Sequence, residues 1–252
     1  MDCRITGSAI LSDGRVALAD FCNKMVKVHS PCNNRIEASL DFSSSPFDVA
    51  EIINGRIAVT VPSSRKIFML SVYELSLKCD NSMQTDGACR GICSDKIHLY
   101  VSFDNPPKVE ILDLQGRLLK VIVKDGNNQK LFSSPWYIAF NPVNNRIYVT
   151  DREKDSVTCM TADGKFVASH KERDLIRPYG IAADTSGVVY VCARRTDKIV
   201  CFTPNLKRMD IIDDNGAYIH KPESVACWNK RDRLYVGLYR DDDMTVLDIQ
   251  KS

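Results

Sequence analysis

The sequence of 252 residues has no apolar run long enough to cross a membrane, because Asp, Lys, Asn or Ser interrupts its hydrophobic stretches every few residues. A transmembrane helix needs about 20 consecutive apolar residues. The first residues also lack the basic segment and the following apolar segment that a secretory signal requires. We therefore expect a cytoplasmic protein without a membrane-spanning helix.

A large net charge is also lacking, since 34 Lys and Arg residues stand against 32 Asp and Glu residues. The formal net charge of +2 excludes the strong positive field of a dedicated DNA-binding protein and leaves only local basic patches. A hydrophobic content of 44% with 26% charged residues is typical of a globular domain. Fibrous and largely disordered classes are excluded.

Histidine is scarce, and the four His residues form no grouping typical of metal ligands. Among the ten cysteines the one close pair, Cys89 and Cys93, has no second pair at zinc spacing. Four others lie in β-like runs, where thiols act as small core side chains: Cys159, Cys192, Cys201 and Cys227. We expect reduced thiols and neither a metal nor another cofactor.

The sequence does contain a repeat with a period near 42 residues. The residue that closes the second strand of each copy falls at 20, 61, 103, 151, 193 and 238, and an apolar residue follows six positions later every time. Each copy is predicted to form short antiparallel strands. The triplets at 13–15, 54–56 and 163–165 contain Asp-Gly or Asn-Gly, which predicts two-residue hairpin turns.

Continuous apolar runs in the second strands indicate sheets that are buried on both faces, so the sheets must stack on one another. Radial stacking of such sheets is a β-propeller. The predicted fold is all-β, a single six-bladed β-propeller of four-stranded antiparallel blades over residues 1–252. The predicted blades are 4–41, 42–83, 84–124, 130–170, 174–210 and 218–252.

The last blade is expected to be incomplete, because three strands use residues 223–249 and only 250–252 remain. Residues 1–4 are too few to supply an outer strand of typical length. We therefore expect a three-stranded last blade and a natural polypeptide that begins further upstream.

Five segments carry a family resemblance: 135–139 and 178–182 at the start of an inner strand, 15–20 and 146–151 in the following strand, and 162–166 in the last turn. These segments resemble the NHL-repeat family of six-bladed propellers, especially the C-terminal propeller of tripartite-motif (TRIM) proteins. WD40 and kelch propellers fit less well, since the Trp-Asp dipeptide and the paired glycines are missing. The resemblance implies the substrate-recognition part of a TRIM-like E3 ubiquitin ligase.

In similar propellers the loops that lead into the inner strands lie on one face and bind partners. We expect this face to contain the following residues: Phe47, Arg90, Trp136, Tyr137, Arg177, Tyr179, Arg194, Arg195 and Lys221. Basic and aromatic side chains together suit single-stranded RNA. The same loops carry many carboxylates, so that a solvated rim and a face for a protein partner or ubiquitination substrate are both favoured over RNA.

A metal-dependent propeller hydrolase or lyase is a further alternative. In enzymes of that class, His, Glu and Asn or Asp side chains meet at the central channel. The inner strands predicted for this chain contain no His. Asp48 and Glu223 are the only inward carboxylates that the pattern predicts, too few for a strong metal site. The chain also has no RING or B-box zinc pattern. We expect a recognition module without a catalytic site.

Overall fold

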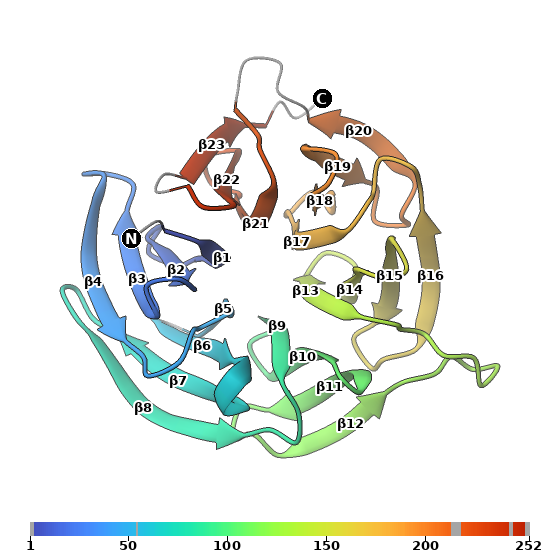
Figure 1. The fold of residues 1–252 in the computed structure, drawn as a ribbon, viewed down its shortest axis with the longest axis horizontal. Coiled ribbons are helices and arrows are strands. Elements are labelled where there is room, and N and C mark those ends of the chain that lie inside the picture. Colours follow the sequence, from blue (N-terminus) through green and yellow to red (C-terminus); the bar gives the residue numbers. More distant parts are fainter. Residues whose placement is uncertain (1–2, 54, 213–217, 242–243, 250–252) are drawn as a thin grey trace.

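The computed structural model describes residues 3–53, 55–212, 218–241 and 244–249, and it confirms the prediction of an all-β, six-bladed propeller. Six antiparallel sheets surround a central channel, and the chain passes through them in sequence order (Figure 1). Within the described residues no helix has the length and apolar character needed to cross a membrane.

Each of the first three blades has four strands, which run in order from the channel to the outside. Blade one contains β1 (Ile5–Ile10), β2 (Val16–Asp20), β3 (Met25–Ser30) and β4 (Arg35–Asp41). Blade two contains β5 (Asp48–Ile53), β6 (Arg56–Val61), the short 3-10 helix η1 (Pro62–Ser64), β7 (Lys66–Val72) and β8 (Leu77–Gln84). Blade three contains β9 (Cys89–Ser94), β10 (His98–Asp104), β11 (Pro107–Asp113) and β12 (Leu118–Ile122).

Blades four and five repeat this arrangement, and blade six has three strands, as predicted. Blade four contains β13 (Pro135–Asn141), β14 (Arg146–Asp151), β15 (Ser156–Thr161) and β16 (Phe166–Lys171). Blade five contains β17 (Pro178–Ala183), β18 (Val189–Ala193), β19 (Lys198–Phe202) and β20 (Arg208–Ile212). Blade six contains β21 (Pro222–Trp228), β22 (Arg233–Leu238) and β23 (Met244–Asp248), and in the described part of the chain β23 pairs with β22 alone.

The second strand of each blade is almost entirely buried, which confirms the interpretation of the apolar runs. All residues of β2 and β18 are buried, and β14 is buried except at its first residue. The outer strands are largely exposed, as in β12, where four of five residues are exposed. The core therefore lies between the blades, and its burial requires the closed ring.

Two of the three predicted hairpin turns are longer than two residues. β1 and β2 are joined by 11–15, where the N–H of Gly14 donates to the carbonyl oxygen of Leu11 and Gly14 has φ of 92°. Gly164 occupies the same kind of turn with φ of 80°. Of the three predicted turns, the one between β5 and β6 joins its strands through two residues, since Ile53 pairs with Arg56. Glycine supplies the positive φ in each case.

The inner strands approach one another closely at every second blade. A Cβ atom on Gly7 would lie 2.5 Å from Cα of Asp48, and one on Gly91 would lie 2.6 Å from Cα of Tyr137. Gly180 stands in the same relation to Ser224, at 2.7 Å. Glycine in blades one, three and five therefore makes room for a larger residue in blades two, four and six.

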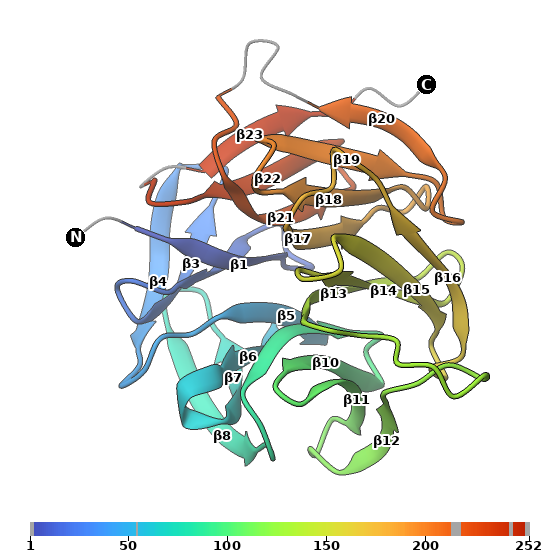
Figure 2. The same cartoon turned by 45° about the vertical axis from the view of Figure 1, so that its right-hand side comes forward.

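The ring closes where blade one meets blade six. Strand β1 lies beside β21 (Figure 2), and the hydroxyl of Ser224 donates a hydrogen bond of 3.1 Å to the carbonyl oxygen of Ile5. A buried carboxylate, Glu223, joins the same two blades through Arg4. The two ends of the repeat array are thus held by polar contacts at the channel.

Candidate functional site

The propeller has two faces, which differ in chemistry. We call the side from which the chain enters the inner strands the loop face, and it also carries the connections between second and third strands. The opposite side carries the turns between first and second strands and is called the turn face. The predicted partner-binding residues all belong to the loop face, whereas the main cavity of the channel opens on the turn face.

The four aromatic residues predicted for the loop face point inward and are buried. Phe47, Trp136, Tyr137 and Tyr179 are 4%, 7%, 3% and 6% exposed. Phe47 packs edge to face on Trp136 with ring centroids 5.5 Å apart, and it stacks on Tyr137 at 5.1 Å. The expectation that these rings offer a stacking surface for bases is corrected, because they fill the loop-face half of the channel and their faces are already used.

Arginine side chains cover this aromatic cluster from the solvent side. The guanidinium of Arg152 lies 3.9 Å from the ring centroid of Trp136, and that of Arg90 lies 4.3 Å from it. Arg194 lies 5.0 Å from the ring centroid of Tyr179. Such cation–π contacts hold the guanidinium groups in place and keep their charge. Arg152 follows directly on the strand that closes with Asp151, in a loop between a second and a third strand that the sequence pattern places on this face.

Two of the predicted arginines are partly neutralised by ion pairs. Arg194 Nε lies 3.0 Å from an oxygen of Glu223, which is fully buried, as expected for an inward carboxylate. Arg4 makes two hydrogen bonds to the same carboxylate. Arg90 pairs with Asp104 at 3.0 Å. Sequence reasoning missed Arg4 because its partner lies 219 positions away.

A second group of arginines is not neutralised. Arg177 and Arg195 are exposed, and with the half-buried Arg152 they line a hollow of about 250 Å³ on the loop face. Within the described residues none of these three guanidinium groups makes an ion pair. Two carboxylates share the hollow, and Asp155 accepts the backbone N–H of Arg177 at 2.8 Å. The structure therefore brings Arg177 and Arg195 together, as predicted, and adds Arg152.

The last predicted residue, Lys221, lies apart from this hollow. It is half-buried, its Nζ lies 5.9 Å from the ring centroid of Tyr239, and its backbone N–H donates to Asp197. The guanidinium groups of Arg4 and Arg194 also lie over the Tyr239 ring, at 5.1 Å and 4.5 Å from its centroid. The nine predicted residues thus divide into a packed layer over the channel and a smaller set of solvent-facing cations.

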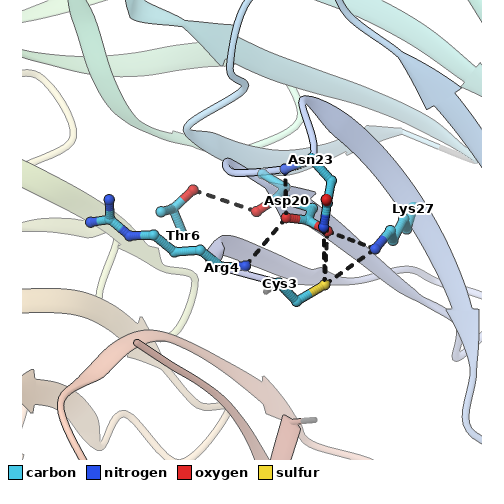
Figure 3. A network of polar contacts seen from close by, with 7 residues as sticks. Cys3, Arg4, Thr6, Asp20, Asn23 and Lys27 are labelled. Atoms are coloured by element: carbon cyan, nitrogen blue, oxygen red, sulfur yellow. Dashed lines mark hydrogen bonds and ion pairs between the residues drawn. The ribbon is translucent and has the colours of Figure 1, made fainter. Parts of the chain in front are cut away.

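A polar network fixes the loop face of blade one (Figure 3). Asp20 is fully buried and accepts hydrogen bonds from Cys3 Sγ, the Asn23 amide and Lys27 Nζ, at 2.8, 2.7 and 2.6 Å. Burial by itself would raise the pKa of Asp20, but these donors lower it to about 2. The backbone N–H of Arg4 also donates to Asp20, while its guanidinium points away from the network (Figure 3).

Tyr137 closes the channel between the two faces. Its hydroxyl donates a hydrogen bond of 2.5 Å to the carbonyl oxygen of Thr6, which joins blade four to blade one across the channel. On the turn-face side of this contact lies a cavity of about 580 Å³, lined by all six inner strands. Asp48 lies at this cavity and is 6% exposed. The Tyr137 side chain therefore blocks the channel on the loop-face side of the cavity, and the cavity opens on the turn face.

No group of three or more His, Cys, Asp or Glu side chains in the described residues is arranged to hold a metal ion. Four of the ten cysteines are buried: Cys89, Cys159, Cys192 and Cys201. The expectation that thiols serve as core side chains is confirmed at the last three of these positions and at the partly buried Cys227.

Comparison with known proteins supports the fold and leaves the family open. No family model matches the chain, and no curated protein does. Among solved structures it is similar to a streptogramin B lyase, with 17% identity, a TM-score of 0.70 and coverage of 100% of this chain and 85% of that one. It is also similar to a chain of the nidogen/laminin complex, with 16% identity, a TM-score of 0.74 and coverage of 88% and 84%.

A virginiamycin B lyase from Staphylococcus aureus is a further similar structure, with 14% identity, a TM-score of 0.69 and coverage of 100% of this chain and 86% of that one. Identities this low establish a shared propeller fold and nothing about activity. Binding proteins and enzymes both occur among these structures. The NHL-repeat and tripartite-motif resemblance stays a prediction.

Proposed function

We propose that this propeller is a non-catalytic recognition module that binds an acidic segment of a protein partner on its loop face. The observation that carries the proposal is the group of Arg152, Arg177 and Arg195 around one hollow, since all three lack an ion pair within the described residues. Carboxylates of a partner would accept charge-assisted hydrogen bonds from these guanidinium groups and neutralise their charge.

The geometry of the neighbouring layer supports a protein over a nucleic acid. Single-stranded RNA binds through bases that stack on exposed rings, and Phe47, Trp136 and Tyr179 are buried. Arginine is among the residue types enriched in protein interfaces, and a rigid layer beneath it lowers the entropy cost of binding. RNA remains the second candidate only through phosphate contacts to the same three arginines.

Within a longer polypeptide that carries a RING domain, the propeller would select the substrate of a TRIM-like ubiquitin ligase. This role rests on the family resemblance. We also place the protein in the cytoplasm, because buried cysteines such as Cys159 and Cys192 serve as core side chains, as is usual in a reducing compartment.

The test compares charge reversal on the two faces. The variant Arg177→Glu/Arg195→Glu changes the hollow, and Lys165→Glu/Lys207→Glu makes the same charge change in turns on the opposite side. Each immobilised protein is incubated with cell extract, half of it treated with RNase, and bound proteins are quantified by mass spectrometry. We expect partners that survive RNase, are retained by the turn-face variant and are lost from the loop-face variant.

Identical partner profiles for both variants would remove the protein-binding proposal. Partners that disappear after RNase treatment would favour the RNA alternative. In that case binding of a labelled single-stranded RNA should weaken steeply with salt, because each neutralised phosphate releases counterions.

A further inference from the structure

The turn-face cavity is independent of the proposed partner-binding hollow. It occupies the half of the channel beyond Tyr137 and is lined by the second halves of all six inner strands, arranged around the axis in Figure 1. Its volume of about 580 Å³ lies within the range of roughly 300 to 1,000 Å³ that is common for small-molecule sites. The contact between Tyr137 and Thr6 shuts it off from the loop face.

Aliphatic residues from the inner strands form part of the cavity wall. These aliphatic residues of the inner strands are small or branched: Ala9, Ile10, Val49, Ala50, Ile138 and Ala182. A wall of this kind favours an apolar ligand body by removing its surface from water. Few charged groups reach the cavity, so each of them has a large effect on which ligand can bind.

The deepest charged group is Asp48, on β5 in blade two. One of its carboxylate oxygens accepts the backbone N–H of Val49 at 2.9 Å, and the other accepts the backbone N–H of Ile92, also at 2.9 Å. These bonds fix the carboxyl group between β5 and β9. In the described residues no cation forms an ion pair with Asp48, which is buried and lines the cavity.

The remaining polar groups also favour a cation. Glu51 and Asp95 line the same cavity, and in the described part of the chain Lys96 is the single basic residue that does so. Glu51 accepts the N–H of Ser12, while Asp95 accepts hydrogen bonds within its own blade. The hydroxyl oxygen of Ser8 is buried at the cavity and has no hydrogen-bond partner among the described residues. It is therefore able to accept a hydrogen bond from a ligand.

We propose that the turn-face cavity binds a small organic amine, whose ammonium group pairs with Asp48 and whose apolar body lies against the aliphatic wall. The ammonium supplies the cation that Asp48 lacks in the described structure. An N–H of the same group is donated to Ser8. A neutral ligand of the same shape would gain the apolar contacts alone, and an anion would be repelled by the excess of carboxylates.

The state of Asp48 makes this binding depend on pH in a defined direction. Burial raises the pKa of Asp48 to about 8, against the opposing effect of the N–H groups of Ile92 and Val49. The titratable groups that face it are Cys93 of β9 and Tyr137 of β13, and burial raises the pKa of both, so they stay neutral while Asp48 titrates. Below about pH 8 the amine must therefore displace a proton from Asp48.

Affinity is thus expected to rise with pH until Asp48 is ionised, and to fall again only when the ammonium loses its proton near about pH 10. Binding near neutral pH should release about one proton, since the ammonium stabilises the carboxylate form. At the rim, burial would raise the pKa of Asp95, but hydrogen bonds from His98, Ile97 and Tyr100 lower it, so this carboxylate adds no comparable dependence.

The experiment uses phenethylamine and its neutral counterpart phenethyl alcohol as probes. Isothermal titration calorimetry at about pH 6 and about pH 8.5, in two buffers of different ionisation enthalpy, gives affinity and proton release together. We expect the amine to bind about tenfold more tightly than the alcohol at the higher pH, and at least about tenfold more tightly there than at the lower pH. Alcohol binding should not change with pH.

Three variants locate the site. Asp48→Asn should abolish both the preference for the amine and its pH dependence, whereas Asp210→Asn, an exposed position on an outer strand, should change neither. Ala182→Phe narrows the cavity and should weaken both probes. Circular dichroism checks that each variant is folded, and if Asp48→Asn is not, the proton release and pH profile of the unmodified protein decide the question.

Equal affinity for amine and alcohol would overturn the proposal, as would an amine affinity that does not vary with pH. Absence of saturable binding at about 10 mM probe, or unchanged affinity in Ala182→Phe, would also overturn it. None of these outcomes touches the loop-face proposal, because the two sites lie on opposite faces.

Discussion

Arg4 and Glu223 form a two-point ion pair, with Nε to Oε2 at 2.7 Å and Nη2 to Oε1 at 3.0 Å, and so connect the first blade to the last. Glu223 is fully buried, while the side chains of Arg4 and Arg194 are 23% and 18% exposed. One carboxylate thus balances two guanidinium groups at the seam of the ring. We expect the stability of the closed propeller to depend on this carboxylate.

The variant Glu223→Gln should destabilise the protein by about 3 kcal/mol, because it removes the negative charge from two partly buried cations. Urea denaturation measures the change. Asp113→Asn is the matched control, since Asp113 pairs with the 79% exposed Arg117 and should leave the denaturation midpoint unchanged. Equal midpoints for both variants would contradict a special role of the seam.

Gly91→Ala should destabilise the fold by about 3 kcal/mol, because its Cβ would lie 2.6 Å from Cα of Tyr137 and backbone atoms cannot move aside as a side chain can. Gly126→Ala is the control, as its Cβ would meet no atom within 4 Å. Thermal unfolding of the two variants gives the comparison. A loss of stability no larger at position 91 than at position 126 would refute the proposed close approach of the inner strands.

Asp48 should make stability fall as pH rises. Its pKa is about 8 in the folded protein against an ordinary value of 3.8, so the folded state holds a proton that the unfolded state has lost. The resulting stability is fully present below about pH 4 and is lost between there and about pH 8, by up to about 1.4 kcal/mol per pH unit. Denaturant titrations of the unmodified protein and Asp48→Asn over this range isolate the effect, and parallel curves would disprove it.

The ten cysteines should all react with a thiol reagent in denaturant without reductant, and two or more missing groups would reveal a disulfide. In the folded protein the exposed Cys22, Cys32 and Cys79 should react first. Burial raises the pKa of Cys89 to about 11 and that of Cys201 to about 12, so both should react only after unfolding. The time course of labelling, followed by peptide mapping, separates the classes.

The number of blades could be predicted because each blade is formed by one continuous copy of the sequence repeat. The period near 42 and the apolar run of each second strand define where strands start and which ones are buried. Turn lengths were predicted less well. The turn at 11–15 has the expected glycine, yet its length depends on how the paired strands end, which a dipeptide does not specify.

The channel could not be predicted, because it forms where six inner strands from distant parts of the chain converge. Sequence alone determined that Phe47 and Trp136 precede or begin inner strands; the tertiary structure decided that their rings turn into the channel and are covered by arginines. It also decided that Arg4 meets Glu223 and that Asp48 lies at a cavity where burial favours its protonated form. Local periodicity in the sequence determines the strands. The charge and burial of a residue at the channel axis depend on side chains from all six blades, which are distant in the sequence.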